Sequence, residues 1–388
     1  MGAGWRIKYS RFNRSKICLR RPKRNNVIIY DLVGADVIEP YVRHYGSTVL
    51  HTRRELYYFR PALVALVRSF IFQQQFSCEY EDSFIRLVQP RLVISFIDNN
   101  MSFHQLARRH PKVKTILIQN GYRTRSMDLF GRDIPKTKGF VDHFFIFGAA
   151  TADYYSQYLD AVFHPSGSLI NNATPISHQT RSDSLVFISQ FSQGIKMVSR
   201  PDGSIISQQE FYNSEKMVLP KLSKWCKENQ MKLVISGTQV LSHSEAEHEF
   251  FGSMIPPEDF LLVPKESRSS SYGLIDQSKL FCFIDSTLGY EALLRGARGI
   301  AVGDRANVLK DESFDFCWPK EIDPSGPFWT NSTEYGDIKR TLDFAMTADQ
   351  EAWNQIVAHT MSQVMEFDSE NSVLRDTLSD LLDKSSEL

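Results

Sequence analysis

The residues with the clearest chemical pattern are five consecutive ones that follow an apolar run at 280–284: Asp285, Ser286, Thr287, Leu288 and Gly289. The run is typical of a buried strand, and the residues after it suit the start of a helix. A helix start has unpaired N–H groups and a partial positive charge, so with the Ser286 and Thr287 hydroxyls it can hold a phosphate. Gly289 would allow close approach of a ligand, and Glu291 would accept hydrogen bonds from ribose hydroxyls. The alternative is simple N-capping by Ser286 or Thr287.

Polar residues and glycines also follow the other apolar runs of the sequence. In the first half the candidate substrate-binding residues are Asp31, Asn99, Asn100, Gln119, Asn120, Gly121 and Arg123, and Asp98 is the candidate reacting carboxylate. In the second half the candidates for the nucleotide phosphates are Gln190, Ser192, Ser236, Gly237 and Arg305. Amide, hydroxyl and guanidinium groups all donate to phosphates or carboxylates. Polar loops, helix caps and an exposed arginine are the alternatives that these residue types leave open.

Bringing these residues together requires parallel strands, because ligands collect where the strands of such a sheet end. The chain contains two series in which apolar runs alternate with helix-like segments. Such alternation is typical of parallel sheets covered by helices on both faces. A stretch rich in Ser, Asn, Thr and Pro separates the two series. We therefore predict an α/β protein with two Rossmann-like domains, divided into a basic arm at 1–25, a first domain at 26–170, a linker at 171–183, a second domain at 184–345, and C-terminal helices with a polar tail at 346–388.

The composition limits the classes of partner and cofactor. Lysine plus arginine and aspartate plus glutamate each number 45 among 388 residues, so no net field favours nucleic acid. Five scattered cysteines lack metal-ligand spacing, there is no clear DxD motif, and the charged segment at 243–249 suits a solvated helix face. We therefore expect no metal and no bound cofactor. Neither a signal peptide nor an apolar run of about 20 residues is visible, which favours a cytoplasmic protein.

The N-terminal arm is strongly basic. Nine basic residues and no acidic ones lie between Arg6 and Arg24. Such a cluster can sit against anionic lipid headgroups, where each charge contributes about 1 kcal/mol. A solvated arm without a partner is the alternative. Peripheral contact with the inner face of a membrane is therefore an expectation.

The stretch Asp285-Ser-Thr-Leu-Gly-Tyr-Glu-Ala-Leu-Leu-Arg-Gly resembles the donor-site motif of GT-B glycosyltransferases. Together with residues 94–100, 118–123 (Ile-Gln-Asn-Gly-Tyr-Arg) and 187–191 (Phe-Ile-Ser-Gln-Phe), it is similar to bacterial surface carbohydrate biosynthesis proteins, including O-antigen enzymes. The resemblance covers most of 27–305. It implies two Rossmann-like domains facing a central cleft, with the acceptor and the chemistry mainly on the first domain and the nucleotide mainly on the second.

The resemblance gives Asp98 one of two roles. In an inverting transfer it would be the general base that deprotonates the acceptor hydroxyl, and in a retaining double displacement it would be the nucleophile on the anomeric carbon. The alternative is that Asp98, or its neighbours Asn99 and Asn100, caps the helix that follows.

Taken together, these features predict a metal-independent GT-B glycosyltransferase. It would move a sugar from a nucleotide-activated donor to a surface polysaccharide or a lipid-linked acceptor. The donor is either a nucleoside diphosphate sugar or a cytidine-monophosphate-activated acidic sugar such as Kdo or a nonulosonic acid. Three alternatives remain open: a nucleotide-sugar 2-epimerase, a polyol-phosphate transferase, and a non-catalytic glycan-assembly subunit. Much of this functional prediction rests on analogy between folds.

Overall fold

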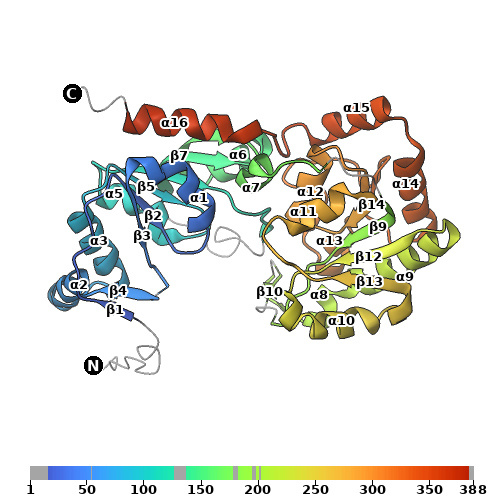
Figure 1. Cartoon of the computed structure of the whole chain (residues 1–388), viewed down its shortest axis with the longest axis horizontal. Helices are drawn as coiled ribbons and strands as arrows, with labels where there is room; N and C mark the ends of the chain where they lie inside the picture. The colour runs from blue at the N-terminus through green and yellow to red at the C-terminus, as the bar shows by residue number, and fades with distance from the viewer. Residues whose placement is uncertain are drawn as a thin grey trace.

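The computed structural model describes residues 16–53, 55–125, 137–177, 182–194, 198–200 and 202–383. Two six-stranded sheets form two α/β domains that lie next to each other (Figure 1). Neighbouring strands pair in parallel throughout both sheets. The predicted α/β class with two Rossmann-like domains is therefore confirmed. Of the predicted basic arm at 1–25, residues 1–15 lie outside the described residues, as do residues 178–181 of the predicted linker.

The first domain is built on the sheet β3 (Ser47–Leu50), β2 (Val27–Tyr30), β5 (Leu92–Ser95), β6 (Lys114–Ile118), β7 (Gly139–Ile146) and β8 (Leu159–Pro165), in spatial order. Its helices are α1 (Ala35–Val42), α2 (Phe59–Phe72), α3 (Phe76–Val88), α4 (Met101–His104), α5 (Leu106–Arg109), α6 (Ala149–Ser156) and α7 (Leu169–Ala173). A separate parallel pair joins β1 (Lys16–Cys18) to β4 (Leu56–Tyr58). The central strands β2 and β5 are buried at every position because helices cover both of their faces.

The second domain is built on the sheet β13 (Phe260–Val263), β12 (Lys232–Ser236), β9 (Ser182–Ile188), β14 (Ser278–Phe283), β15 (Gly299–Val302) and β16 (Trp329–Thr330). Its helices are α8 (Gln208–Phe211), α9 (Asn213–Glu228), α10 (Glu245–Gly252), α11 (Ser270–Asp276), α12 (Thr287–Leu294), α13 (Arg305–Leu309), α14 (Tyr335–Thr347) and α15 (Gln350–Met361), and β10 (Val198–Ser199) and β11 (Ile205–Ile206) form a short hairpin. Buried side chains from most of these strands and helices form one large apolar core, and those of β11, α8 and α13 belong to a smaller cluster.

The strand orders identify where each sheet can bind a ligand. In the second sheet the order reverses between the neighbouring strands β9 and β14, and in the first sheet it reverses between β2 and β5. Loops leave such neighbours in opposite directions, which opens a crevice at the carboxyl ends of the strands. The segments that follow these four strands contain Asp31, Asp98, Gln190 and Ser286, so these four candidates from the sequence lie at the two reversal points.

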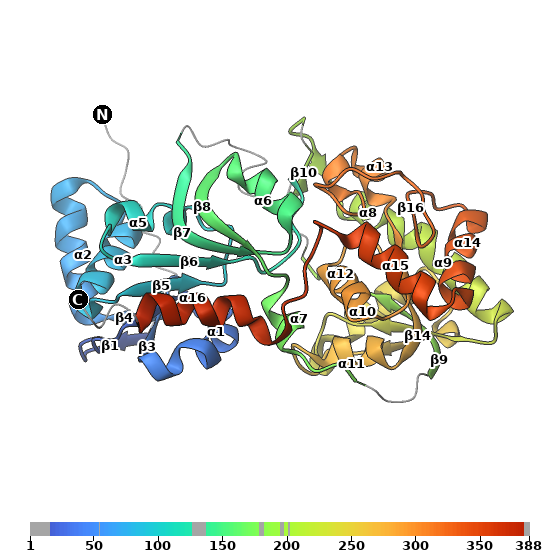
Figure 2. The same cartoon turned by 90° about the horizontal axis from the view of Figure 1, so that it is seen from above.

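The C-terminal part of the chain divides between the two domains. Helix α15 packs in the core of the second domain, whereas α16 (Ser372–Leu382) lies along the first domain (Figure 2). The buried leucines of α16 pack against β2 and β5, and Arg91 donates hydrogen bonds to the carbonyls of Leu381 and Leu382. The segment predicted as one unit at 346–388 therefore contributes to both domains, and its predicted start falls inside α14.

Candidate functional site

A cavity of about 760 Å³ lies between the two domains. The residues predicted from the sequence that line it are Asn120, Gly121, Arg123, Gln190, Ser192, Ser286, Thr287, Leu288 and Glu291. These residues follow β6 in the first domain and β9 and β14 in the second. Strand ends that lie far apart in the sequence therefore meet at one site, as expected for parallel sheets.

Helix α12 begins at this cavity. Ser286 is its N-cap residue, but the Ser286 side chain makes no capping hydrogen bond. The Thr287 hydroxyl accepts a hydrogen bond of 2.8 Å from the backbone N–H of Tyr122 in the first domain, and the Tyr122 ring stacks on Tyr290 with the centroids 4.4 Å apart. The side chain of Thr287 thus joins the domains, while Ser286 lines the cavity without serving as a side-chain cap.

Gly289 lies in α12 but not at the cavity. A Cβ atom at this position would lie 2.1 Å from the ring of Phe283 in β14. Glycine is therefore required for α12 to pack against the sheet. The close approach predicted at Gly289 is made by a phenylalanine ring and not by a ligand.

Glu291 is the buried acid of the cavity. The Tyr272 hydroxyl donates a hydrogen bond to Glu291 Oε2 at 2.7 Å. Burial raises the pKa of Glu291 to about 7, and hydrogen bonds from Ser168 and Tyr272 and the charge of Arg295 oppose this rise. The carboxyl group therefore changes charge near neutral pH, and perturbed acids of this kind are frequent in ligand sites.

Arg305 is fully buried and does not line the cavity. Its guanidinium donates to Glu215, to Asp285 Oδ1 at 2.5 Å and to Gln190 Oε1 at 3.0 Å. Two carboxylates already neutralise this charge, so the predicted contact with a leaving phosphate is not available in this structure. The guanidinium instead positions Asp285 and Gln190 at the cavity wall.

The loop after β12 does not reach the cavity. Ser236 is buried, and the carboxylate of Glu247 in α10 accepts hydrogen bonds from the backbone N–H groups of Thr238 and Gln239 and from the Ser189 hydroxyl. A Cβ atom at Gly237 would lie 3.0 Å from Glu247 Oε2. The Glu247 carboxylate therefore already accepts the backbone N–H groups that this loop could offer to a phosphate. The prediction that Ser236 and Gly237 contact a phosphate is corrected: both residues make contacts within the second domain. Glu247 is fully buried and is not part of a solvated helix face.

Asp98 is buried behind Arg123. The carboxylate of Asp98 has no exposed surface, and Arg123 donates to both of its oxygens, at 2.5 Å to Oδ1 and 3.3 Å to Oδ2. Arg123 also donates to Asn120 Oδ1, and it lines the cavity whereas Asp98 does not. The group that reaches the cavity is therefore the arginine, and Asp98 fixes its direction.

Three of the remaining candidates of the first domain, Asn100, Gln119 and Asp31, have structural partners. Asn100 is the N-cap of α4, and its Oδ1 accepts from the N–H of Ser102, so the cap is Asn100 rather than Asp98, while Asn99 next to it is half-buried. Gln119 uses its amide to join Gly121 O to Phe147 N.

Asp31 accepts hydrogen bonds from the Val33 amide, the Thr52 hydroxyl and Arg53 Nε. Asp31, Asn99, Asn100 and Gln119 do not line the cavity. In this conformation they are therefore not placed to contact a substrate bound in the cavity.

Two cations and a tyrosine of the cavity were missed by the sequence prediction. Lys265 follows β13, Arg268 and Tyr272 lie near the start of α11, and all three line the cavity. Arg268 also forms an ion pair of 3.2 Å with Asp36 across the domains. The signal for Lys265 was present, since it stands two positions after the apolar run at 260–263, which is typical of a strand.

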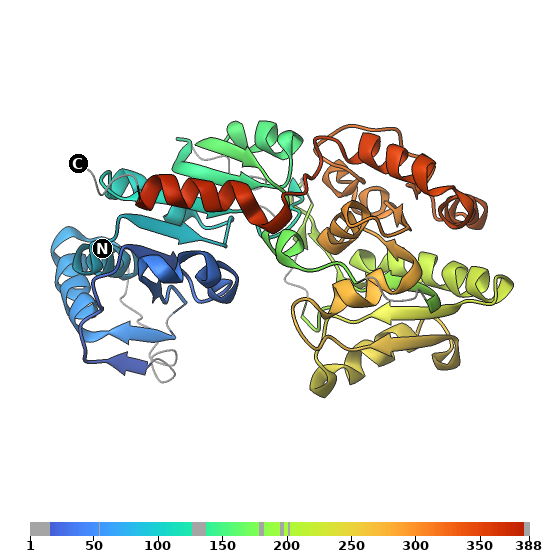
Figure 3. The same ribbon diagram turned by 45° about the horizontal axis from the view of Figure 1, so that its top comes forward.

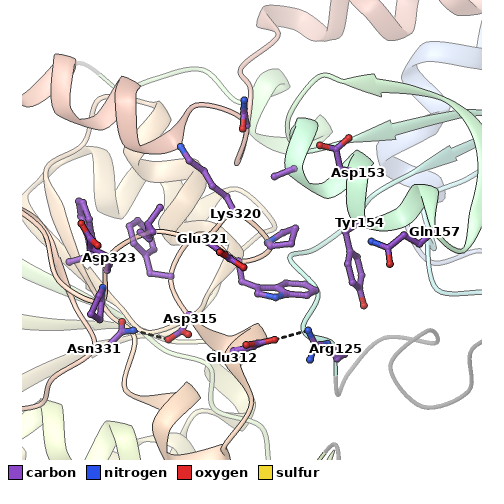
Figure 4. Close-up of a pocket in the computed structure, with 18 residues that line it drawn as sticks. Arg125, Asp153, Tyr154, Gln157, Glu312, Asp315, Lys320, Glu321, Asp323 and Asn331 are labelled. Carbon is purple, nitrogen blue, oxygen red and sulfur yellow. Dashed lines mark hydrogen bonds and ion pairs between the residues drawn. The ribbon is translucent and has the colours of Figure 1, made fainter.

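A second cavity, of about 800 Å³, has a lining with a net negative charge. It is lined by five carboxylates, those of Asp153, Glu312, Asp315, Glu321 and Asp323, and by two cations, Arg125 and Lys320. In Figure 4 Arg125 points toward Glu312, which it pairs with at 2.8 Å, and Asn331 points toward Asp315. Burial and the charge of Glu312 raise the pKa of Asp315. A nucleotide phosphate is repelled by this lining, so the smaller cavity is the candidate nucleotide site.

Neither a metal-binding cluster nor a membrane-spanning helix is found in the described part of the chain. It contains no group of three or more His, Cys, Asp or Glu residues placed to hold a metal ion. None of its helices combines the length and the apolar character needed to cross a bilayer.

Comparisons with known proteins identify a family and a fold. A family model described as "putative O-antigen biosynthesis protein" matches residues 116–382. No curated protein matches the sequence. Among solved structures, the S. aureus MnaA-UDP co-structure has a TM-score of 0.53 at 11% identity, covering 95% of this chain and 97% of that one.

Two other solved structures have the same arrangement. A "putative UDP-N-acetylglucosamine 2-epimerase" from Listeria monocytogenes has a TM-score of 0.53 at 13% identity, with coverage of 94% and 98%. The wall teichoic acid polymerase TagF has a TM-score of 0.52 at 9% identity, with coverage of 94% and 90%. At these identities the similarity is one of fold, and that fold is the GT-B-like pair of Rossmann-type domains.

Proposed function

The chain belongs to the family described as "putative O-antigen biosynthesis protein", and from that premise we propose that it is a glycosyltransferase of surface glycan assembly. Its donor is a nucleotide-activated sugar and its acceptor a polysaccharide or lipid-linked glycan. The observation that carries the proposal is the cavity between the domains, where a helix start, cations and a buried acid converge from separate strand ends.

The nucleotide lies on the second domain in this proposal. Its phosphate is held at the start of α12 by backbone N–H groups and the Ser286 hydroxyl, with Lys265 as counter-charge and Ser192 as a further donor. Its ribose hydroxyls donate to Glu291, one helical turn further along. The sugar then extends toward Asn120 and Arg123 of the first domain, where Arg123 donates to the donor sugar or to the acceptor.

Epimerisation is the second candidate, because a structure named as a 2-epimerase shares this fold. An epimerase acts on the nucleotide sugar alone, whereas a transferase releases nucleotide only when an acceptor is present. A polyol-phosphate transferase would release a nucleoside monophosphate and leave phosphate in its product, and a non-catalytic subunit would release nothing. The O-antigen family favours glycosyl transfer among these four.

The first test is a thermal-shift screen with cytidine monophosphate and with uridine, guanosine and thymidine diphosphates. A ligand at about 100 times its dissociation constant should stabilise the protein by roughly 2.7 kcal/mol. The matching nucleotide sugar is then incubated with and without a lipid-linked glycan, and released nucleotide is measured. Acceptor-dependent release supports transfer, whereas an isomerised sugar formed without acceptor replaces it with epimerisation. No shift with any nucleotide contradicts the proposal.

We predict that Lys265→Met weakens nucleotide binding by about ten- to a hundredfold, because a charge-assisted hydrogen bond to phosphate contributes about 1.5–3 kcal/mol. The measurement is titration calorimetry with the nucleotide found in the screen. Lys232→Met is the matched control, because Lys232 starts β12 and so lies at the other end of the sheet from the cavity. Equal affinity for Lys265→Met and wild type would remove Lys265 from the phosphate site.

A further inference from the structure

The outward side of α2 is apolar. Its sequence is Phe-Arg-Pro-Ala-Leu-Val-Ala-Leu-Val-Arg-Ser-Phe-Ile-Phe, with two arginines and no acidic residue. Phe70 is 74% exposed, Ile71 61% and Leu66 56%. The other exposed large apolar residues of this helix are Phe59, Leu63, Val64, Val67 and Phe72. One helix thus displays eight of them, whereas isolated exposed apolar side chains are the ordinary case.

This arrangement reverses the usual pattern of a surface helix. A helix of a soluble domain turns its apolar side chains toward the core and its polar ones toward water. In α2 the buried residues are the small Pro61 and Ala65, and α3 supplies the aromatic core on which they rest. Arg68 pairs with Glu79 of α3 at 2.6 Å, so one of the two charges is also turned inward. The large side chains of α2 are therefore arranged for a partner outside the domain.

Exposed basic residues lie beside this apolar side. Strand β1 pairs in parallel with β4, with Lys16 opposite Leu56 and Cys18 opposite Tyr58. Both strands therefore end at the same side, where β4 continues directly into α2 and β1 continues into residues 19–24. The exposed cations of that stretch and of β1 are Lys16, Arg20, Arg21, Lys23 and Arg24, and Ile17 and Leu19 between them are exposed as well.

The apolar and basic residues together form one surface, the α2/β1 surface, which consists of α2 and residues 16–24. Figures 1 and 3 show α2, β1 and β4 at the end of the first domain that is farthest from the second domain. Neither α2 nor residues 16–24 contain an acidic residue, so the charge of this surface is positive. The surface is separate from the nucleotide cavity, and none of its residues lines that cavity.

We propose that the α2/β1 surface docks the protein on an anionic lipid bilayer. The outward side chains of α2 enter the boundary between headgroups and acyl chains, and the cations of residues 16–24 lie against lipid phosphates. A second copy of the chain is a poorer occupant, because a two-fold contact would place the same basic residues opposite each other. The proposal concerns attachment only and does not depend on which reaction the cavity performs.

The test is flotation of the full-length protein with vesicles of phosphatidylcholine alone or mixed with phosphatidylglycerol. We expect binding to the anionic vesicles that weakens with salt. Arg20→Gln with Arg21→Gln should weaken it by roughly thirtyfold, since each charge near the surface is worth about fivefold. Phe70→Glu with Ile71→Glu should weaken it by more than about tenfold.

The matched control is Leu241→Glu with Leu261→Glu, because these residues of the second domain are 78% and 59% exposed. This control should bind vesicles as wild type does. All variants should keep the wild-type unfolding temperature, since the replaced side chains are exposed. Absence of wild-type binding to anionic vesicles overturns the proposal, and so does unchanged binding of the α2 variant. A dimer that the α2 variant converts to a monomer, without vesicle binding, assigns the surface to a second copy instead.

Discussion

Replacing Asp98 with alanine is expected to remove turnover and to lower the free energy of unfolding by about 3 kcal/mol, because it leaves the inward-turned charge of Arg123 without its main partner. The folded fraction of the variant should still bind nucleotide, since Asp98 lies outside the cavity. Calorimetric unfolding and nucleotide titration on the same preparation measure the two effects. Asn100→Ala, which removes the neighbouring helix cap, is the control and should cost only about 1 kcal/mol.

A double-mutant cycle separates the two roles that Asp98 can take. If Asp98 is a positioning residue, Asp98→Asn and Arg123→Gln lose similar amounts of kcat/KM, and the double variant is no worse than either. The double variant should also be more stable than Asp98→Asn, because no unpaired charge remains. A far larger loss of kcat for Asp98→Asn than for Arg123→Gln would instead restore Asp98 as the reacting carboxylate, which requires a conformation in which Arg123 has moved away.

The sequence predicted three of the segments that meet at the cavity, those after β6, β9 and β14, but it missed the one after β13 and wrongly added the loop after β12. Apolar runs fixed the strands, and the rule that ligands bind at the carboxyl ends of parallel strands led to Gln190, Ser286, Thr287 and Arg123. The same rule applied to the strand at 260–263 would have included Lys265. The residue types that follow the strands therefore indicate which side chains lie near the cavity.

The roles of individual side chains were harder to predict, because they depend on partners distant in the sequence. Arg305 is neutralised by Glu215, which is 90 residues away, and Asp98 is covered by Arg123. Glu247 is buried because the amide groups of Thr238 and Gln239 need an acceptor there. A single sequence shows which charges exist but not which of them neutralise each other.

The exposed apolar side of α2 has a similar explanation. The sequence pattern predicts a helix around 61–75, and an apolar helix is expected to lie in a core. Whether it does so depends on how much covering surface the fold offers, and here α3 already fills the space against the sheet. The preference of an apolar side chain for burial depends on its residue type. The apolar surface that is available to cover it depends on how the whole domain packs.

Glu291 should give the nucleotide affinity and the stability opposite dependences on pH. Its pKa in the folded protein is raised to about 7 from an ordinary value of 4.5. The folded state therefore binds a proton more tightly than the unfolded state, so stability falls as pH rises between these two values. The ribose hydroxyls, as donors, favour the carboxylate, so nucleotide affinity should rise as pH passes through about 7.

Glu291→Gln is expected to abolish both dependences. At about pH 8.5 its nucleotide affinity should be about ten- to a hundredfold below wild type, because a hydrogen bond to a charged acceptor contributes about 1.5–3 kcal/mol. At about pH 5.5 the two proteins should bind alike, since wild-type Glu291 is then protonated. Its unfolding temperature relative to wild type should increase with pH, because the amide carries no buried charge.

Tyr272→Phe provides the matched control for this titration. The Tyr272 hydroxyl donates to Glu291 and helps to lower its pKa, so removing it should move the midpoint of the affinity curve to higher pH. Titration calorimetry with one nucleotide across this range measures all three proteins. If the nucleotide affinity of the wild type does not vary with pH, Glu291 does not accept hydrogen bonds from the ribose. If the stability difference between wild type and Glu291→Gln nevertheless varied with pH, the carboxyl group would be a buried structural acid and the ribose would lie elsewhere in the cavity.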